Sequence, residues 1–117
     1  MVSRLPRLVR PMTYALYLDD ERSPKTDREW VIVRSYDAFV AAIEERGLPA
    51  HMSLDHDLGE ESKSGLECAK WLVERCLDEG WDLTPVDINV HSANTVGREN
   101  IRGLLEGFQR HQQEEGT

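Results

Sequence analysis

The sequence lacks several features, and each absence excludes a class of protein. No stretch of its 117 residues approaches the roughly 18 uncharged apolar residues that a transmembrane helix needs. Basic residues are in the minority, 14 against 22 acidic ones for a net charge of −8, which excludes binding to an extended nucleic-acid duplex through many neutralised phosphates. We therefore expect no membrane partner and only local contact with any nucleic acid.

Cysteine is also scarce. Cys68 and Cys76 are the two cysteines, and the helix expected around them separates them by roughly 12 Å, whereas a disulfide needs Cα atoms within about 7 Å. Arg and Pro interrupt the apolar runs near the start, so we expect no secretory signal. Reduced thiols without such a signal predict a cytoplasmic protein.

The length predicts one compact domain whose ends differ in composition. Residues 1–13 contain three arginines and no carboxylate, and we expect a flexible basic arm there. The alternative is that Met12, just before the first expected strand, is the true start. The domain itself is expected over residues 14–111. Residues 112–117 are expected to form a polar tail that frays.

Apolar runs and helical periodicity alternate along the domain. Four short apolar runs predict strands, at residues 14–18, 30–33, 51–54 and 86–90. Three amphipathic segments predict helices, one capped by Ser35 and ending at Gly47, one over residues 65–79, and one from Asn94 or Thr95 to about residue 111. This alternation predicts an α/β fold with a doubly wound, mainly parallel sheet of about four strands and helices on both faces.

The most unusual residues follow three of these strands, at 19–20, 55–57 and 91–94. Ligands of open α/β sheets bind at the carboxyl ends of the strands, so we expect these residues to converge. Clustered carboxylates favour a hard divalent cation, which makes Asp19, Asp20 and Asp55 candidate ligands of Mg²⁺ or Mn²⁺. The alternative is that the same carboxylates only form solvated turns and helix caps.

Histidine and arginine accompany the carboxylates. His56 and His91 could transfer protons near neutral pH, although either could instead be structural. The helix that begins near Asn94 turns its free N–H groups to the same edge, which favours an anion. Arg98 and Arg22 could grip a phosphate there or form ordinary salt bridges with neighbouring carboxylates.

Longer motifs carry a family resemblance. The segments LDDER (18–22), SLDHDLG (53–59), VHSAN (90–94) and VGREN (96–100) resemble the cyclic-phosphate processing receiver-like family, over about residues 14–110. The resemblance implies a flavodoxin-like receiver fold and the processing of cyclic phosphates on nucleic acids or nucleotides, and some members are encoded by phages.

The resemblance also implies roles for single residues. Asp19 and Asp20 match the acidic metal-binding pair of a receiver, and Asp55 matches its phosphoacceptor. Asp57 falls where a receiver offers a backbone carbonyl to the metal. The family's own histidines match His56 and His91, and Ser92 lies near the receiver's hydroxyl residue.

Two departures from an ordinary receiver favour hydrolysis over signalling: no lysine follows Lys70, and only four strands are clear. The resulting hypothesis is a metal-dependent phosphoesterase acting on 2′,3′-cyclic phosphate RNA ends or cyclic nucleotides. His56 and His91 would serve as acid and base in an unassigned order, and Asp55 could instead attack the phosphate. The anion would be held by residues that follow two strands, namely Arg22, Ser92, Asn94 and Arg98. The alternatives are a receiver phosphorylated on Asp55 and a non-catalytic module that binds a phosphate-bearing nucleotide or RNA end.

Overall fold

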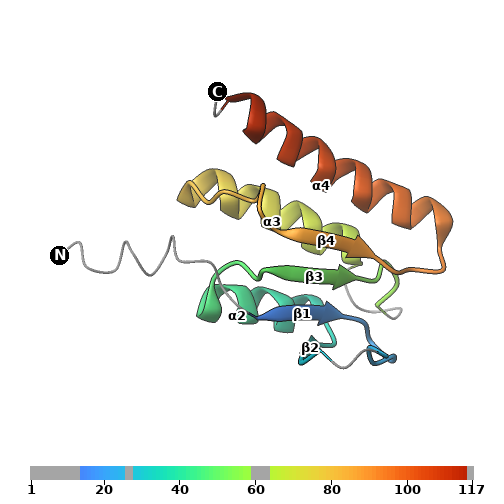
Figure 1. Ribbon diagram of the computed structural model, residues 1–117. Coiled ribbons are helices and arrows are strands. Elements are labelled where there is room, and N and C mark those ends of the chain that lie inside the picture. Colours follow the sequence, from blue (N-terminus) through green and yellow to red (C-terminus); the bar gives the residue numbers. More distant parts are fainter. Residues whose placement is uncertain (1–13, 26–27, 59–63, 116–117) are drawn as a thin grey trace.

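The computed structural model describes residues 14–25, 28–58 and 64–115, so the basic arm expected at residues 1–13 lies outside the described part. Four parallel strands form one sheet in the order β2-β1-β3-β4 (Figure 1). The elements in chain order are β1 (Ala15–Leu18), β2 (Val31–Val33), α2 (Tyr36–Arg46), β3 (His51–Leu54), α3 (Gly65–Glu79), β4 (Asp87–Val90) and α4 (Thr95–Glu115). The predicted receiver-like, flavodoxin-type sheet is confirmed.

Side-chain caps set the helix starts, and two of them, Ser35 and Asn94, are caps that the sequence predicts. The Ser35 side chain accepts a hydrogen bond from Ala38 N at the start of α2, and Ser64 does the same for α3. At α4 the cap is Asn94, whose Oδ1 accepts from Gly97 N at 2.9 Å. Gly80 ends α3 with φ at +72°, a left-handed conformation that glycine adopts without a steric penalty.

The three described helices pack on one face of the sheet, whereas the sequence predicted helices on both faces. The strand residues on one face of the sheet, among them Leu16, Met52 and Val90, are buried in a single cluster with residues of all three described helices. The other face carries Ile32, which is 40% exposed, and the exposed Asp87 and Asn89. Among the described residues, no helix covers this second face.

The handedness of the connections explains this arrangement. The steps from β2 to β3 and from β3 to β4 run in the same direction across the sheet, so right-handed connections place α2 and α3 on the same face. The step from β1 to β2 runs the opposite way and would place a helix on the second face. Residues 19–25 and 28–30 of this connection contain no helix.

The last helix is longer than predicted, because α4 continues to Glu115 instead of fraying after residue 111. The Gln112 side chain explains the extension: its Nε2 donates to Trp81 O at 2.9 Å and its Oε1 accepts from Leu83 N at 2.8 Å. These bonds tie the last turns of α4 to the loop before β4. Within the described residues, no helix is long and apolar enough to cross a membrane.

Candidate active site

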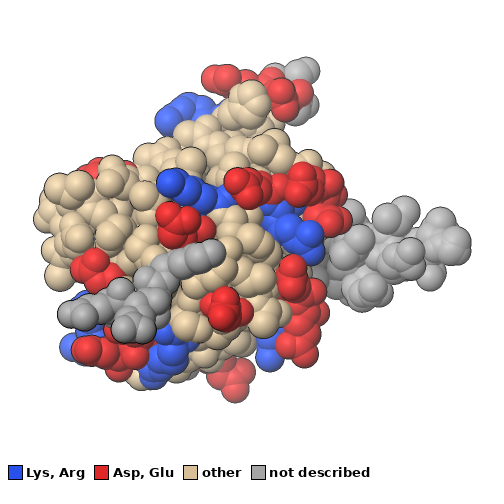
Figure 2. Space-filling view, turned by 180° about the vertical axis from the view of Figure 1, so that it is seen from behind, with Lys and Arg blue, Asp and Glu red and all other residues tan. Residues whose placement is uncertain are grey.

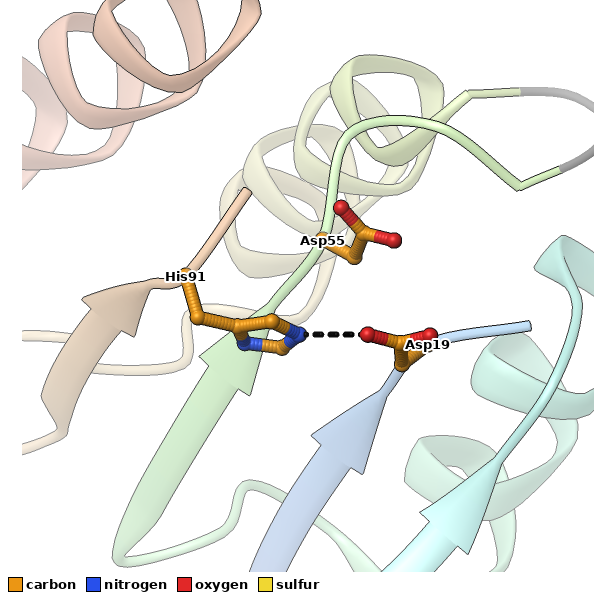
Figure 3. Close-up of side chains that lie close together, drawn as sticks. All are labelled: Asp19, Asp55 and His91. Atoms are coloured by element: carbon orange, nitrogen blue, oxygen red, sulfur yellow. Dashed lines mark hydrogen bonds and ion pairs between the residues drawn. The ribbon is translucent and has the colours of Figure 1, made fainter. Parts of the chain in front are cut away.

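Three side chains meet at the carboxyl edge of the sheet (Figure 3). Asp19 follows β1, Asp55 follows β3 and His91 follows β4. One possible ligand atom of each lies within 4.8 Å of the others, and we call the three the Asp–Asp–His cluster. The cluster forms because β1, β3 and β4 are neighbours, so the residues that follow them emerge side by side.

Main-chain bonds fix the position of each cluster residue. The backbone N–H of each one donates to the carbonyl oxygen of the last residue of the neighbouring strand, at distances of 2.9 to 3.1 Å. These bonds extend the parallel ladders one step beyond the strands. The side chains therefore project from rigid backbone rather than from a free loop.

Asp19 is 1% exposed, yet the environment favours its carboxylate form. Its Oδ1 accepts from the backbone N–H groups of Glu21 (2.9 Å) and Arg22 (2.8 Å), and its Oδ2 lies 3.0 Å from His91 Nε2. Burial alone would raise the pKa of Asp19, but these hydrogen bonds outweigh it and hold the pKa below its usual value. Arg34 Nη1 supports the turn by donating to the Asp19 carbonyl at 3.1 Å.

Asp55 differs from Asp19 in that no hydrogen bond or ion pair connects its carboxylate to another described residue, although the residue still lines the hollow. It is 3% exposed and lines the hollow beside Asp19. A buried carboxylate is costly unless it is paired or binds a cation. That Asp55 has no partner in the described part of the chain is therefore the clearest indication of a cation site in the cluster.

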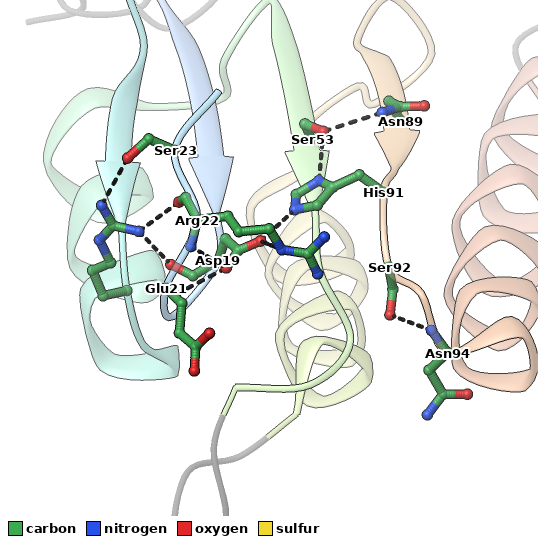
Figure 4. A network of polar contacts seen from close by, with 10 residues as sticks. Asp19, Glu21, Arg22, Ser23, Ser53, Asn89, His91, Ser92 and Asn94 are labelled. Atoms are coloured by element: carbon green, nitrogen blue, oxygen red, sulfur yellow. Dashed lines mark hydrogen bonds and ion pairs between the residues drawn. The ribbon is translucent and has the colours of Figure 1, made fainter. Parts of the chain in front are cut away.

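His91 is held on three sides. Its Nε2 faces Asp19 and its Nδ1 lies 2.7 Å from Ser53 Oγ (Figure 4). Its ring also stacks on Tyr17, with centroids 4.6 Å apart and planes within 4°. These contacts leave the ring one orientation. His91 was predicted as an acid or base, and its place in the cluster is compatible with that role or with metal ligation.

A hollow of about 200 Å³ opens over the cluster. Its lining is mostly acidic and comprises Asp19, Asp20, Glu21, Arg22, Asp55, Asp57 and Ala93. Five carboxylate side chains against one guanidinium favour a cation, and oxygen donors of this kind suit a hard one. The Asp–Asp–His cluster could hold a metal ion at the base of this hollow.

The other predicted site residues of the β3 loop lie outside the close cluster. The Asp57 carboxylate accepts a hydrogen bond from His56 Nδ1 at 2.8 Å, which together with a weaker contact to Asn94 lowers the pKa of Asp57 despite the opposing effect of burial. The His56 ring packs so closely on Gly97 that a Cβ there would lie 2.4 Å from His56 Cγ. The His56 ring is thus packed against the first turn of α4.

The four predicted phosphate-binding residues also have partners within the protein. The buried Ser92 hydroxyl accepts from Asn94 N at 3.1 Å, and Arg98 Nη1 donates to Ser92 O at 3.2 Å. Arg22 Nε lies 3.5 Å from Asp19 Oδ2, with 57% of its side chain exposed. Of the four, Arg22 reaches the hollow, whereas the other three shape the turn that leads into α4.

Sequence reasoning missed Ser53, Asn89 and Tyr17. All three lie on the uncovered face at one level of the sheet, because Tyr17 pairs with Ser53 and Ser53 pairs with Asn89. Asn89 Nδ2 donates to Ser53 Oγ at 3.1 Å, which connects it to His91. The period-two spacing of Ser53 to Asp55 and of Asn89 to His91 is a signal that could have identified them.

Comparison with known proteins gives one match. A family model described as "Cyclic-phosphate processing Receiver domain" matches residues 14–107, a range that contains every residue of the cluster and of the hollow. No curated protein and no solved structure matches the chain.

Proposed function

Because the chain belongs to the cyclic-phosphate processing receiver domain family, we propose that it is a metal-dependent phosphodiesterase that opens a 2′,3′-cyclic phosphate on an RNA end or nucleotide. The single observation that carries the proposal is the Asp55 carboxylate, which has no partner among the described residues and lines an acidic hollow beside Asp19. A cyclic phosphate is an anion, which these carboxylates would repel. A cation bound between them offsets this repulsion and lets the phosphate bind in the hollow.

The proposed cation is Mg²⁺ or Mn²⁺, held by Asp19 and Asp55, with Asp20 and Asp57 further out along the hollow. When bound, such an ion acts as a Lewis acid that stabilises charge on the phosphoryl oxygens. Arg22, the one guanidinium in the lining, supports binding of the anionic group.

The reaction is hydrolysis of one ester bond of the ring. Water adds to phosphorus and loses a proton to a base, while the bond from phosphorus to one ribose oxygen breaks and that oxygen gains a proton. The place of His91 in the Asp–Asp–His cluster, to which His56 does not belong, favours His91 as the residue that supplies this proton. The product is a terminal phosphomonoester and a free hydroxyl.

The test is turnover of an RNA oligonucleotide that ends in a 2′,3′-cyclic phosphate, with Mg²⁺ or Mn²⁺. We expect metal-dependent opening that falls at least about 100-fold in Asp55→Asn and in His91→Ala. Asp87→Asn is the matched control, because this exposed carboxylate lies at the opposite end of β4 and pairs with His51. Absence of turnover with both metals, on oligonucleotides and mononucleotides alike, would contradict the proposal.

Asp55 also supports a second candidate function, a receiver that is phosphorylated on this residue. The carboxylate of Asp55 follows the strand at the position that the phosphoacceptor occupies in a receiver. The chain has no lysine after Lys70 to assist such chemistry. Incubation with acetyl phosphate followed by intact-mass measurement separates the two candidates. A stable gain of one phosphoryl group that is lost in Asp55→Asn supports signalling, and an unchanged mass supports hydrolysis.

A further inference from the structure

The residue that follows β2 lies in the same row at the carboxyl edge as the residues of the cluster. Leu18 pairs with Val33, so the register of β1 and β2 places Arg34 beside Asp19. The Arg34 side chain contacts residues 19–23, which we call the β1 turn (Figure 4). This turn supplies four of the seven residues that line the hollow.

One guanidinium binds the β1 turn at three points. Arg34 Nη1 donates to the carbonyl oxygens of Asp19 at 3.1 Å and Arg22 at 2.6 Å, and Nη2 donates to Ser23 Oγ at 3.2 Å. Because the guanidinium is a rigid planar fork, it fixes the separation of the three oxygens. The ammonium of a lysine is a compact point charge and does not reproduce this pattern.

The β1 turn in its turn orients the Asp19 carboxylate. The sheet fixes the Asp19 backbone, because its N–H donates to Val33 O. The two N–H groups that bind Oδ1 belong to Glu21 and Arg22, which lie within the turn. With Oδ1 engaged in this way, Oδ2 is the oxygen that faces His91 in the cluster. The direction of the carboxylate therefore depends on the shape of the turn.

Arg34 also differs from the arginines that form ordinary surface ion pairs. Arg75, for example, lies 3.3 Å from Glu44 and 3.2 Å from Glu79. Figure 2 shows acidic and basic side chains next to one another over the side of the molecule opposite to that in Figure 1. Within the described residues no carboxylate contacts Arg34, which binds only the neutral oxygens of one turn. Its contacts are those of a side chain that orders backbone.

We propose that Arg34 is a positioning residue for the cation site and for the anion bound beside it. By holding the β1 turn closed, it keeps Asp19 Oδ1 occupied, leaves Oδ2 available to the cation, and brings the Arg22 guanidinium to the hollow. The role toward a cation and a phosphate rests on the proposed function. The ordering of the turn by Arg34 is a property of the protein alone.

The first test is calorimetric titration of Mn²⁺ into the full chain, which requires no turnover. Groups that orient metal ligands are typically worth 10-fold to 100-fold in metal affinity, so we expect Arg34→Gln to raise the Kd of Mn²⁺ by about this factor. Arg34→Lys keeps the charge without the fork and should recover little of the loss. Arg28→Gln is the matched control, because Arg28 belongs to the same connection but lies over the Trp30 ring, 5.5 Å from its centroid.

Three results would overturn the proposal. The first is a Kd in Arg34→Gln within about threefold of that of the wild type. The second is an equal loss in Arg28→Gln, and the third is full recovery in Arg34→Lys, because either would assign the effect to net charge. Ser23→Ala removes one contact of Arg34 at an exposed position and should weaken Mn²⁺ binding by a smaller factor. This variant retains the test if Arg34→Gln fails to fold.

The second test is amide hydrogen exchange in EDTA. The N–H groups of Glu21 and Arg22 should exchange about 10-fold faster in Arg34→Gln than in the wild type, because the turn opens more often. The N–H of His91, which donates to Leu54 O, should be unchanged and shows that the sheet is intact. Wild-type exchange rates at Glu21 and Arg22 in this variant would contradict the ordering of the turn.

The third readout is kinetic and separates positioning from a purely structural role. With saturating Mn²⁺ and RNA that ends in a 2′,3′-cyclic phosphate, Arg34→Gln should raise KM about 3-fold to 10-fold, because the grip of Arg22 on the anion is weakened. The change in kcat should stay below about threefold, since the ion is in place. An unchanged KM would contradict the role toward the anion. If the wild type binds no Mn²⁺ or Mg²⁺, the proposed function fails, whereas the exchange rates still decide whether Arg34 orders the turn.

Discussion

His91 Nε2 lies 3.0 Å from Asp19 Oδ2, so the residue after β4 contacts the residue after β1 across the intervening β3. The contact is possible because Ser53, the β3 residue beneath it, is small and allows the imidazole to reach Tyr17 on β1. It connects an anionic side chain that is ready to bind a cation with a ring that can move a proton.

The cation site predicts a specific response to metal. We expect Mn²⁺ or Mg²⁺ to raise the free energy of unfolding of the wild type, by about 2.7 kcal/mol at 100 times Kd. In Asp55→Asn the increase should largely disappear. Without metal this variant should be more stable than the wild type by roughly 1 kcal/mol or more, because the repulsion between two nearby carboxylates is removed.

Thermal unfolding with and without metal, together with calorimetric titration of Mn²⁺, measures both effects. Asp87→Asn should respond to metal as the wild type does. Equal metal stabilisation of the wild type and Asp55→Asn would place the ion elsewhere.

The depressed pKa of Asp19 predicts how stability depends on pH. The folded state binds this proton less readily than the unfolded state does, so Asp19 stabilises the fold above its unfolded pKa, about 3.9. That stabilisation should decline as the pH falls through this value toward the lower folded pKa.

Urea denaturation in EDTA between about pH 6 and pH 2.5 tests this dependence. Asp19→Asn should be less stable at pH 6, because it loses a charged acceptor of two backbone N–H groups, and its stability should change less with pH. A slope in Asp19→Asn equal to that of the wild type would assign the acid sensitivity to other carboxylates.

The contact between Gly97 and His56 predicts a steric effect. Gly97→Ala places a Cβ 2.4 Å from His56 Cγ, so the ring must shift, and we expect a loss of about 1–3 kcal/mol despite the better helix propensity of alanine. Gly103→Ala on the same helix meets nothing within 4 Å and should stabilise by about 0.5–1 kcal/mol. Chemical denaturation measures both variants.

A double-mutant cycle identifies the origin of the Gly97 effect. In a His56→Ala background the alanine at position 97 has room, so its cost should nearly vanish. A cost that persists in this background would show that the backbone at Gly97, rather than the His56 ring, opposes the substitution.

The bonds of Gln112 predict that the last turns of α4 contribute to stability. Gln112→Ala removes two hydrogen bonds to the loop before β4 and should cost about 1–2 kcal/mol, with faster amide exchange at Leu83. Gln113→Ala, its exposed neighbour, should change stability by less than about 0.5 kcal/mol. Equal effects of the two variants would indicate that these turns act only through helix propensity.

The sequence predicted the parts of the site that depend on strand ends. Asp19 and Asp55 could be chosen because each ends an apolar run, and parallel strands end at the same edge. The roles of His56 and His91 could not be separated, because both follow such runs. Their difference depends on tertiary packing, in which Gly97 holds the His56 ring against α4.

The uncovered face and the polar chain of Asn89 and Ser53 required the structure. Helices on both faces were predicted from the alternation of elements, but the described connection between β1 and β2 has no helix. The contact of Asn89 with Ser53 depends on the register of β3 against β4, which periodicity alone does not supply.

The spacing of the cluster along the chain also bears on how the protein folds. Asp19 and His91 are 72 positions apart, and the sheet positions them only after β1, β3 and β4 have all paired. The two proposed cation ligands, Asp19 and Asp55, need less, because they come together as soon as β1 pairs with β3. A bound cation therefore favours every state of the chain in which these two strands are paired, including states in which β4 has not yet joined the sheet.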